Sequence, residues 1–186
     1  MPSIADSRIL ILATHGFEQS ELEVPRDSLR ALGAVVDVAS PDGKPIRGWD
    51  RTDWGREVPA DLAFERVAAE DYQALVLPGG QINPDLLRVD ETAMALVCGF
   101  LRGGKTVAAI CHAPWLLIEA DALRGREATS YHSIRKDLEN AGALWKDQAV
   151  VASEGIVTSR NPGDLEAFVA KIVEELQEGR HAKRAA

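Results

Sequence analysis

The chain has 186 residues, of which 46% are hydrophobic, and it carries a formal net charge of −8. A chain of this length and composition is expected to form one compact domain with a sizeable core. The acidic balance and the lack of a basic stripe argue against nucleic acid or an anionic membrane as a partner. No hydrophobic run in the sequence is long enough to span a bilayer.

The N-terminal segment and the cysteines bear on the cellular compartment. Residues 1–6 lack the charged and apolar regions of a signal peptide. The sequence holds only Cys98 and Cys111, too few for a disulfide scaffold in a chain of this size. We therefore expect a cytoplasmic protein in a reducing compartment.

Strand and helix patterns alternate from the N-terminus onward. Continuous aliphatic runs predict buried strands at residues 8–13, 35–39, 74–77 and 106–110. Apolar residues at helical spacing predict helices at residues 21–32 and 92–102, and Pro114 opens another helix. Residues 44–66 are irregular, and we expect a short hairpin there.

The C-terminal third continues the alternation with shorter elements. A short segment at residues 128–130, a helix at 134–141, strands at 149–152 and 156–159, and a helix at 164–176 are expected. Residues 1–176 are thus predicted to form a single domain, with 177–186 as a polar tail. The repeated units predict an α/β fold in which helices cover both faces of a mainly parallel sheet.

Ligands of such a sheet bind at the carboxyl ends of its strands, and three loops with unusual residues lie there. The loop after the first strand contains Glu18, the third strand ends in Pro78-Gly79-Gly80, and the fourth runs into Cys111-His112. Each loop also has an ordinary structural interpretation. Glu18 could cap a helix, the glycines could form a tight turn, and Cys111 could be a small buried side chain.

Other motifs in the sequence do not indicate a cofactor or a metal. Residues 99–106 fit the P-loop pattern letter for letter, yet they end a helix and enter a strand, the reverse of a P-loop's context. Two cysteines and four scattered histidines offer no paired metal-ligand spacing. We expect no cofactor and no metal.

Four motifs together resemble the DJ-1/ThiJ/PfpI superfamily, most closely its PfpI (intracellular protease I) branch. They are Glu18 and residues 75–80, 109–114 and 158–165, and the resemblance extends from about residue 9 to residue 176. It implies a flavodoxin-like three-layer sandwich related to the class I glutamine amidotransferases.

The resemblance also implies a set of site residues. Cys111 would be the nucleophile on a strained turn, with Glu18 hydrogen-bonded to its sulfur. His112 would be oriented by Asp85, which can come from a neighbouring subunit, since the branch forms homodimers or homohexamers. The backbone at Gly79 and Gly80, with the amide of His112, would form an oxyanion hole.

These residues can support nucleophilic catalysis on chemical grounds as well. A thiol at the start of a helix is favoured as the thiolate. His112 can pair with it as imidazolium or shuttle its proton. Glu18 could be protonated and donate to sulfur, or ionised and remove a proton from a carbon beside a carbonyl. Both roles stay open.

Three classes of function follow. The first is a stress-protection hydrolase acting on small reactive carbonyls or glycated amines, as a glyoxalase or deglycase. The second is an intracellular cysteine peptidase, which needs a cleft for an extended peptide substrate. The third is a redox sensor or chaperone whose cysteine oxidises.

Overall fold

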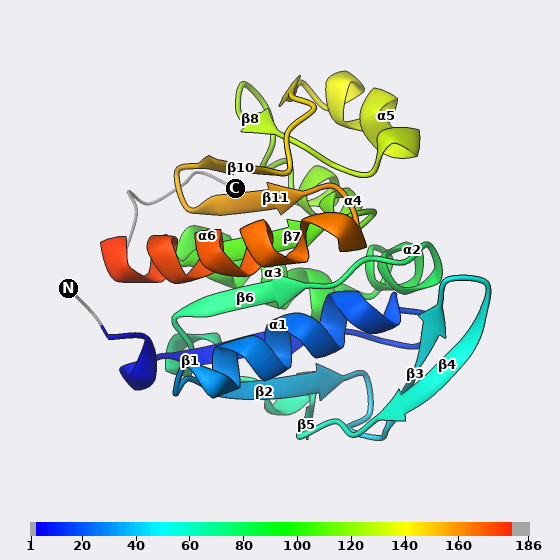
Figure 1. The fold of residues 1–186 in the computed structure, drawn as a ribbon, viewed down its shortest axis with the longest axis vertical. Coiled ribbons are helices and arrows are strands. Elements are labelled where there is room, and N and C mark those ends of the chain that lie inside the picture. Colours follow the sequence, from blue (N-terminus) through cyan, green and yellow to red (C-terminus); the bar gives the residue numbers. More distant parts are fainter. Residues whose placement is uncertain (1–2, 180–186) are drawn as a thin grey trace.

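A seven-stranded sheet between two layers of helices forms the centre of the computed structural model, which describes residues 3–179 (Figure 1). The strand order is β10-β11-β7-β6-β1-β2-β5. These strands are β1 Arg8–Leu12, β2 Val35–Ser40, β5 Leu62–Ala63, β6 Ala74–Leu77, β7 Thr106–Ile110, β10 Val150–Ser153 and β11 Ile156–Ser159. All neighbouring pairs are parallel except β10 and β11, so the predicted mainly parallel, flavodoxin-like sheet is confirmed.

Helices cover both faces of this sheet. Figure 1 shows α1 (Gln19–Ala31) and α6 (Leu165–Glu178) on one side, with α3 (Glu91–Arg102) and α4 (Pro114–Glu119) on the other. The shorter helices are α2 (Ile82–Leu87), α5 (Arg135–Asn140) and the 3-10 turns Ile4–Asp6, Phe64–Arg66, Ala69–Asp71, His132–Ile134 and Pro162–Asp164. Two small sheets pair β3 (Ile46–Asp50) with β4 (Asp53–Val58) and β8 (Glu127–Ala128) with β9 (Leu144–Trp145).

Alternate residues of each central strand enter different halves of the core. In β1, Leu10 and Leu12 pack in the cluster that contains Phe100 of α3, whereas Ile9 and Ile11 pack in the other cluster, with α1 and α6. All four β1 side chains are fully buried. Each such burial stabilises the fold by roughly 1.5–3 kcal/mol. Burial on both faces explains why these strands are continuous aliphatic runs.

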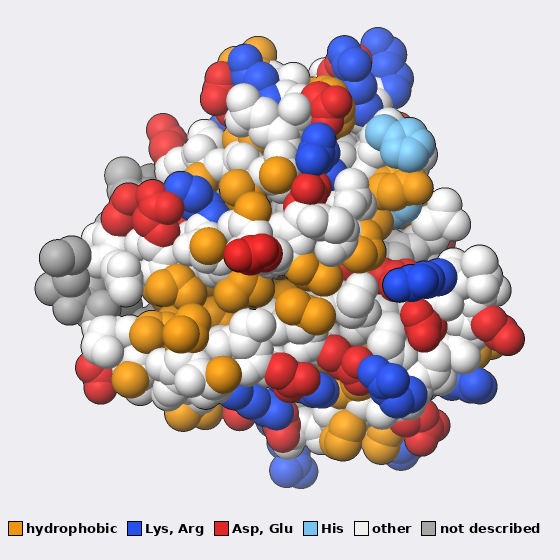
Figure 2. Space-filling model, in the orientation of Figure 1, with side chains coloured by type: hydrophobic (Ala, Val, Ile, Leu, Met, Phe, Trp, Pro, Cys, Tyr) orange, Lys and Arg blue, Asp and Glu red, His pale blue; other side chains and the backbone are white. Residues whose placement is uncertain are grey.

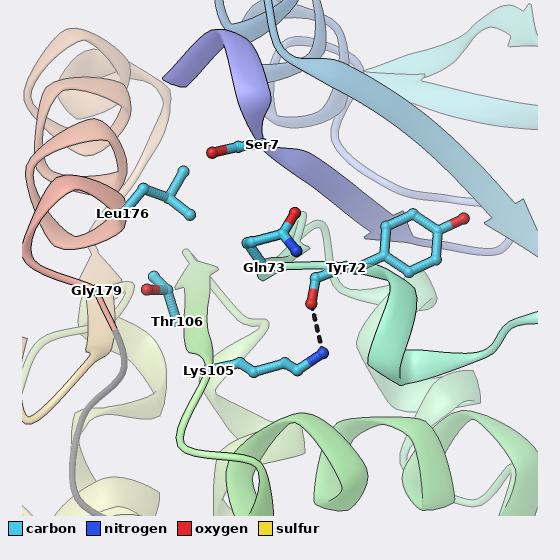
Figure 3. A pocket seen from close by; sticks show the side chains of 7 residues that line it. All are labelled: Ser7, Tyr72, Gln73, Lys105, Thr106, Leu176 and Gly179. Carbon is cyan, nitrogen blue, oxygen red and sulfur yellow. Dashed lines mark hydrogen bonds between the residues drawn. The ribbon is translucent and has the colours of Figure 1, made fainter. Parts of the chain in front are cut away.

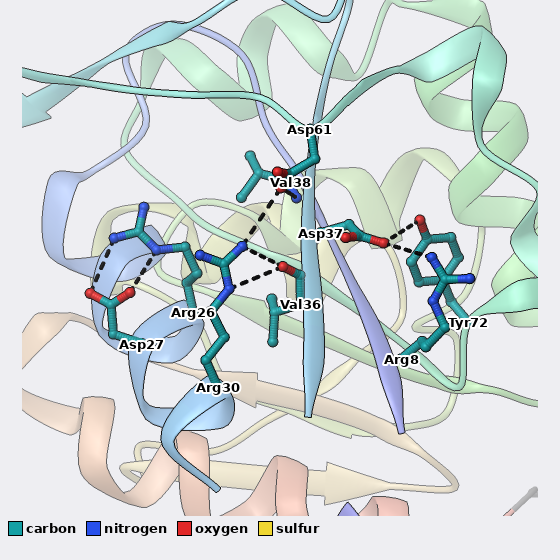
Figure 4. Close-up of polar contacts among 9 residues, drawn as sticks. All are labelled: Arg8, Arg26, Asp27, Arg30, Val36, Asp37, Val38, Asp61 and Tyr72. Atoms are coloured by element: carbon teal, nitrogen blue, oxygen red, sulfur yellow. Dashed lines mark hydrogen bonds and ion pairs between the residues drawn. The ribbon is translucent and has the colours of Figure 1, made fainter. Parts of the chain in front are cut away.

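Polar contacts fasten β2 to its neighbours (Figure 4). The Asp37 carboxylate accepts hydrogen bonds from Arg8 Nη2 and Tyr72 Oη, each at 2.9 Å. On the other face, Arg30 of α1 donates from Nε to the Val36 carbonyl at 3.1 Å. Arg8, Asp37 and Arg30 are partly exposed, so their contacts add little to stability, whereas Tyr72 is buried.

The β3–β4 hairpin packs against the start of α1. Oε1 of the buried Gln19 accepts a hydrogen bond from the Arg56 amide at 2.7 Å. A Cβ at Gly48 or Gly55 would clash with that oxygen, so a side chain at either position would displace Gln19. The Trp49 amide donates to the Phe17 carbonyl at 2.7 Å. The hairpin expected within residues 44–66 is confirmed, and it lies beside the loop that enters α1.

Other differences from the sequence prediction are local. Helix α2 was not expected, because it is one short turn that contains Pro84 and has no side-chain cap. Residues 177 and 178, assigned to the tail, belong to α6; residues 180–186 lie outside the described part of the chain. Of residues 128–130 only Ala128 is in a strand. Within residues 3–179, no helix has the length and apolar content to cross a bilayer.

The surface is mixed in character. On the face shown in Figure 2, hydrophobic side chains gather over α1 and α6, with charged side chains around them. Large exposed hydrophobic side chains also occur along and just after α2, where Ile82, Leu86 and Val89 are 38%, 49% and 79% exposed.

Gly55→Ala is expected to lower the free energy of unfolding by about 1–3 kcal/mol, because the new methyl group would displace Gln19 from the Arg56 amide. Gly99→Ala in α3 is the matched control. Its methyl group would meet only the Ala69 Cβ at 3.8 Å, so helix propensity should raise stability by about 0.5–1 kcal/mol. Urea denaturation measures both. A Gly55→Ala protein as stable as the parent would contradict the packing role of Gln19.

Candidate active site

Cys111 lies on a strained turn directly after β7. Its φ is 64°, a left-handed conformation that non-glycine residues rarely adopt. Two backbone hydrogen bonds hold it there: its N–H donates to the Ser159 carbonyl at 3.0 Å, and its carbonyl accepts from the Tyr131 amide at 2.9 Å. The residue is only 6% exposed. The turn expected from the strand-cysteine-helix pattern is therefore present.

The glycine pair after β6 brings backbone amides to the sulfur. A Cβ at Gly79 would lie 2.7 Å from the Cys111 Cβ, so no side chain fits there. The Gly79 amide donates to Glu21 Oε2 at 2.8 Å. Gly80 has a φ of 77°, and its amide and that of His112 both hydrogen-bond to the Cys111 sulfur. The donors available to an oxyanion are thus Gly80 and His112, while Gly79 holds the carboxyl.

The carboxyl that interacts with the Cys111 sulfur belongs to Glu21, which corrects the assignment of that role to Glu18. Glu21 lies in the first turn of α1 and is fully buried against the sheet. Glu18 precedes the helix, and its half-buried side chain accepts from the Arg51 amide and interacts with Ser20. The helix begins at Gln19, so Glu21 lies on its first turn and Glu18 lies before it. The sequence does not reveal this start, and therefore it does not show which glutamate faces inward.

Glu21 has an unusual protonation state. Burial raises its pKa to about 8, and the charge of Glu18 adds to this, against hydrogen bonds from Gly79, Cys111 and Gly80. At neutral pH the carboxyl therefore keeps its proton and can donate it toward sulfur or toward a bound substrate.

His112 is positioned to take the thiol proton. Its Nδ1 lies 3.1 Å from Cys111 Sγ, and its Nε2 lies 3.1 Å from Ser133 Oγ. The ring stacks on Tyr131 with a centroid separation of 4.9 Å. Burial and the charge of His132 lower its pKa to about 4, so the ring is neutral at neutral pH. The imidazolium considered from the sequence is not favoured, and the neutral ring is able to accept a proton.

The resting cysteine is better described as a thiol than as the thiolate expected from the sequence. Burial raises the pKa of Cys111, and an ionised Glu21 raises it further, while the Gly80 and His112 amides lower it. The helix that follows, α4, has only six residues, so its dipole is small. Since Glu21 holds its proton at neutral pH, its repulsion of a thiolate is absent, and His112 Nδ1 is the base within hydrogen-bond distance of the thiol.

Asp85 does not contact His112 within the single chain. It lies on α2 with an exposed side chain, and the hydrogen-bond partner of the His112 ring is Ser133. Ser133 was not identified from the sequence, because a serine 21 residues after the histidine carries no local signal. Action of Asp85 from a neighbouring subunit remains a prediction.

These groups open into one pocket of about 610 Å³ at the carboxyl ends of β1, β6 and β7. Its lining residues are Gly16, Glu18, Glu21, Trp49, Arg51, Gly80, Gln81, Ile82, Cys111, His112, Tyr131 and Pro162. Among the described residues, no cluster of three or more His, Cys, Asp or Glu side chains is arranged to hold a metal ion. The pocket therefore brings Glu21, Cys111 and His112 together, whereas Asp85 is not among its lining residues.

A smaller cavity of about 200 Å³ lies at the opposite edge of the sheet (Figure 3). Lys105 crosses it and donates from Nζ to the Tyr72 carbonyl at 2.5 Å. Its described lining residues include no cysteine, histidine or carboxylate. This cavity offers no catalytic group comparable to those around Cys111.

The cysteine lies on a strained turn after a central parallel strand, with a neutral histidine, a buried carboxyl and the amides of Gly80 and His112 beside its sulfur. This arrangement is typical of α/β proteins in which a cysteine can serve as a nucleophile. The sequence matches the DJ-1/PfpI family over residues 7–175, and the chain belongs to that family.

Curated relatives cover nearly the full length of the chain. It is 41% identical over 170 residues to "Deglycase PfpI" of Pyrococcus furiosus, covering 91% of this chain and 99% of that protein. It is 44% identical over 162 residues to "Putative cysteine protease YraA" of Bacillus subtilis, covering 87% and 93%.

A solved structure confirms the fold. This is a two-domain protein from Anabaena variabilis with DJ-1/ThiJ/PfpI-like and ferritin-like domains. The TM-score is 0.86 at 35% identity, covering 92% of this chain and 48% of that one. The chain thus spans about half the length of the two-domain protein.

Glu21→Gln is expected to stabilise the fold increasingly as pH rises from 5 to 9. The folded-state pKa is raised from 4.5 to about 8, so between these values the native protein binds more protons than the unfolded chain and loses stability as pH rises. The parent protein loses on the order of 5 kcal/mol of stability between these two pH values. Glu21→Gln has no carboxyl at this position and does not undergo this loss. Urea denaturation at several pH values measures the difference.

Glu166→Gln is the control, because Glu166 is exposed in the first turn of α6. It removes the same charge without burial and should show no comparable pH dependence. A constant stability difference between Glu21→Gln and the parent at pH 5 and pH 9 would show that Glu21 ionises normally.

Proposed function

We propose that this protein is a cysteine-dependent stress-protection hydrolase that acts on reactive carbonyls or glycated amines in the cytoplasm. The observation that carries the proposal is the arrangement around Cys111: a neutral His112 at 3.1 Å, a protonated Glu21 and the amides of Gly80 and His112. The printed names of relatives, deglycase and putative cysteine protease, support a hydrolytic role for a DJ-1/PfpI protein.

The first chemical step is addition of sulfur to a carbonyl. His112 Nδ1 takes the thiol proton as Sγ attacks, so the S–C bond forms and the carbonyl π electrons move onto oxygen. The amides of Gly80 and His112 stabilise the negative charge on that oxygen. Glu21 then donates its proton, which leaves a neutral hemithioacetal, a carboxylate and an imidazolium.

With methylglyoxal, the Glu21 carboxylate next removes the proton from the carbon bonded to sulfur. The electrons move to the adjacent carbonyl oxygen, which His112 protonates to give an enediol. Glu21 returns its proton to the second carbon while His112 takes the hydroxyl proton, and a thioester results. Water, deprotonated by Glu21, attacks the thioester, and His112 protonates the departing sulfur, so lactic acid and the free thiol are formed.

A glycated amine reaches the same hemithioacetal by a different first step. In an adduct of methylglyoxal with an amine, sulfur displaces nitrogen from the hydroxyl-bearing carbon. The C–S bond forms and the C–N bond breaks as His112 takes the thiol proton and Glu21 gives its own proton to the departing amine, which leaves the carboxylate and the imidazolium that the next step requires. The free amine leaves, and the same hemithioacetal remains. One set of groups thus serves both reactions.

A cysteine peptidase is the second candidate. The thiol, the imidazole and the pair of amides suit attack on an amide carbonyl, and the name of the YraA relative supports it. The proposal is less favoured, because an extended peptide needs a long groove. The pocket of about 610 Å³ is bordered by Trp49 and Arg51 of the hairpin on one side and Pro162 on another.

We also propose that the protein forms a homodimer or homohexamer in which Asp85 acts on the neighbouring subunit's site. Asp85 is exposed, as are Ile82, Leu86 and Val89 around it. Such a group of exposed apolar side chains on and just after one short helix is typical of a protein contact. Ser133 would then hold the His112 ring within each subunit, and Asp85 would add a negative charge near it from outside.

Cys111→Ser is expected to reduce methylglyoxal consumption by about three orders of magnitude or more, because the hydroxyl is a far weaker nucleophile. Lactate formation measures the rate, and circular dichroism checks the fold. Cys98→Ser is the control: Cys98 is half-buried on α3 in the opposite half of the core and should leave the rate unchanged. Undiminished consumption by Cys111→Ser would place the reaction elsewhere. Hydrolysis of an unfolded protein that vanishes in Cys111→Ser would favour the peptidase instead.

Mixing two inactive variants tests the role of Asp85. Cys111→Ser and Asp85→Asn should each have low activity alone. If Asp85 acts across a two-fold interface, co-expressed subunits should recover about one quarter of the parent's activity, because half of the dimers are mixed and each has one complete site. Light scattering gives the molar mass. Recovery of no activity, or a monomeric parent, would refute action in trans.

A further inference from the structure

The tip of the β3–β4 hairpin has a strained backbone. Asp50 pairs with Asp53, which leaves Arg51 and Thr52 as the loop. The Thr52 amide donates to the Asp50 carbonyl at 2.7 Å, and the residue between them, Arg51, has a φ of 61°. A three-residue turn with a positive central φ is the rare, strained form of γ-turn. Glycine would adopt it without steric cost.

Contacts on both sides of Arg51 hold its backbone in this conformation. Its carbonyl accepts a hydrogen bond from Trp49 Nε1 at 3.0 Å, and its amide donates to the Glu18 carboxylate. The Trp49 ring in turn meets the Trp54 ring edge-on, with centroids 5.6 Å apart. The arginine is therefore presented by a fixed turn rather than by a loose loop.

The Arg51 guanidinium makes none of the ion pairs within 4 Å found among the described residues, although its charge interacts with the nearby Glu18 carboxylate. The neighbouring Arg56, by contrast, is paired with Glu23 at 2.5 Å. Arg51 lines the same pocket as Cys111. Since His112 is neutral, Arg51 is the single cationic side chain among the described residues of that pocket.

We propose that Arg51 binds the carboxylate of the substrate, so that the site prefers carbonyl adducts of free amino acids over neutral carbonyl compounds. This inference rests on the proposed function and names its substrate class. A guanidinium binds a carboxylate through two parallel hydrogen bonds, which also orients the ligand. The reacting carbon lies at Cys111, and the aromatic and aliphatic side chains of Trp49, Ile82 and Tyr131 line the rest of the pocket. Glu18, beside Arg51, suits an ammonium group next to that carboxylate.

The test compares two adducts of methylglyoxal that differ in one charge: those of Nα-acetyl-lysine and of Nα-acetyl-lysine amide. The parent protein is expected to release the amine from the carboxylate adduct with a kcat/KM about tenfold higher or more, mainly through KM. Added salt should lower the ratio of the two kcat/KM values, because it screens the attraction between Arg51 and the carboxylate.

Arg51→Gly is the informative variant, because glycine suits the positive φ and should not lower the melting temperature. It should bring the two adducts to equal kcat/KM and leave kcat for the amide adduct unchanged. Arg51→Lys, which keeps the charge, should retain part of the preference. Arg56→Gly is the control for loss of a hairpin arginine and should keep the full preference.

Several results would overturn the inference. Equal kcat/KM for both adducts in the parent protein would refute the role of Arg51 and leave the proposed function intact. A change of molar mass in Arg51→Gly would also refute that role, because it would assign the Arg51 side chain to a subunit interface. If neither adduct reacts, the proposed function fails. Unmodified Nα-acetyl-lysine should then still protect Cys111 from iodoacetamide in the parent but not in Arg51→Gly, and equal protection would refute the carboxylate site.

Discussion

The buried contact between the Glu21 carboxyl and the Cys111 sulfur is the constraint on which the rest of the site depends. An ionised carboxylate in this position would be costly, and burial accordingly raises its pKa to about 8. The amide of Gly79 fixes the carboxyl, and the absence of a side chain at Gly79 leaves room for both groups. The site thus holds two protons, one on oxygen and one on sulfur, with His112 unprotonated.

This arrangement separates the roles of two neighbouring titratable groups. Burial lowers the pKa of His112, so its ring is neutral at neutral pH, and burial raises the pKa of Glu21, so its carboxyl is protonated. Both shifts have the same origin, removal from water, and they act in opposite directions because one charged form is a cation and the other an anion. Neither group therefore carries a charge at neutral pH, and in the proposed mechanism charge develops only when sulfur attacks.

Much of the fold could be predicted from the sequence, because buried strands leave a clear hydrophobic pattern. The central strands are covered on both faces, so they are continuous aliphatic runs, and β6 and β7 begin and end at the predicted residues. The turn at Cys111 was also predictable, because Pro114 marks the start of the next helix. What could not be predicted depends on rotation and on distant contacts. The choice between Glu18 and Glu21 depends on where α1 begins. The contact between His112 and Ser133 depends on how the 3-10 turn His132–Ile134 packs against the histidine ring.

The strained turn at Cys111 is held by parts of the chain that are synthesised later. Its amide bonds to Ser159 and its carbonyl to Tyr131, and neither partner is near it in sequence. During translation, therefore, β7 emerges well before the strand and loop that fix the cysteine's conformation. The conformation of Cys111 is therefore assembled only when β11, the last strand of the parallel sheet, docks beside β7. The arrangement of groups around the sulfur is a property of the completed fold and not of the segment that carries the cysteine.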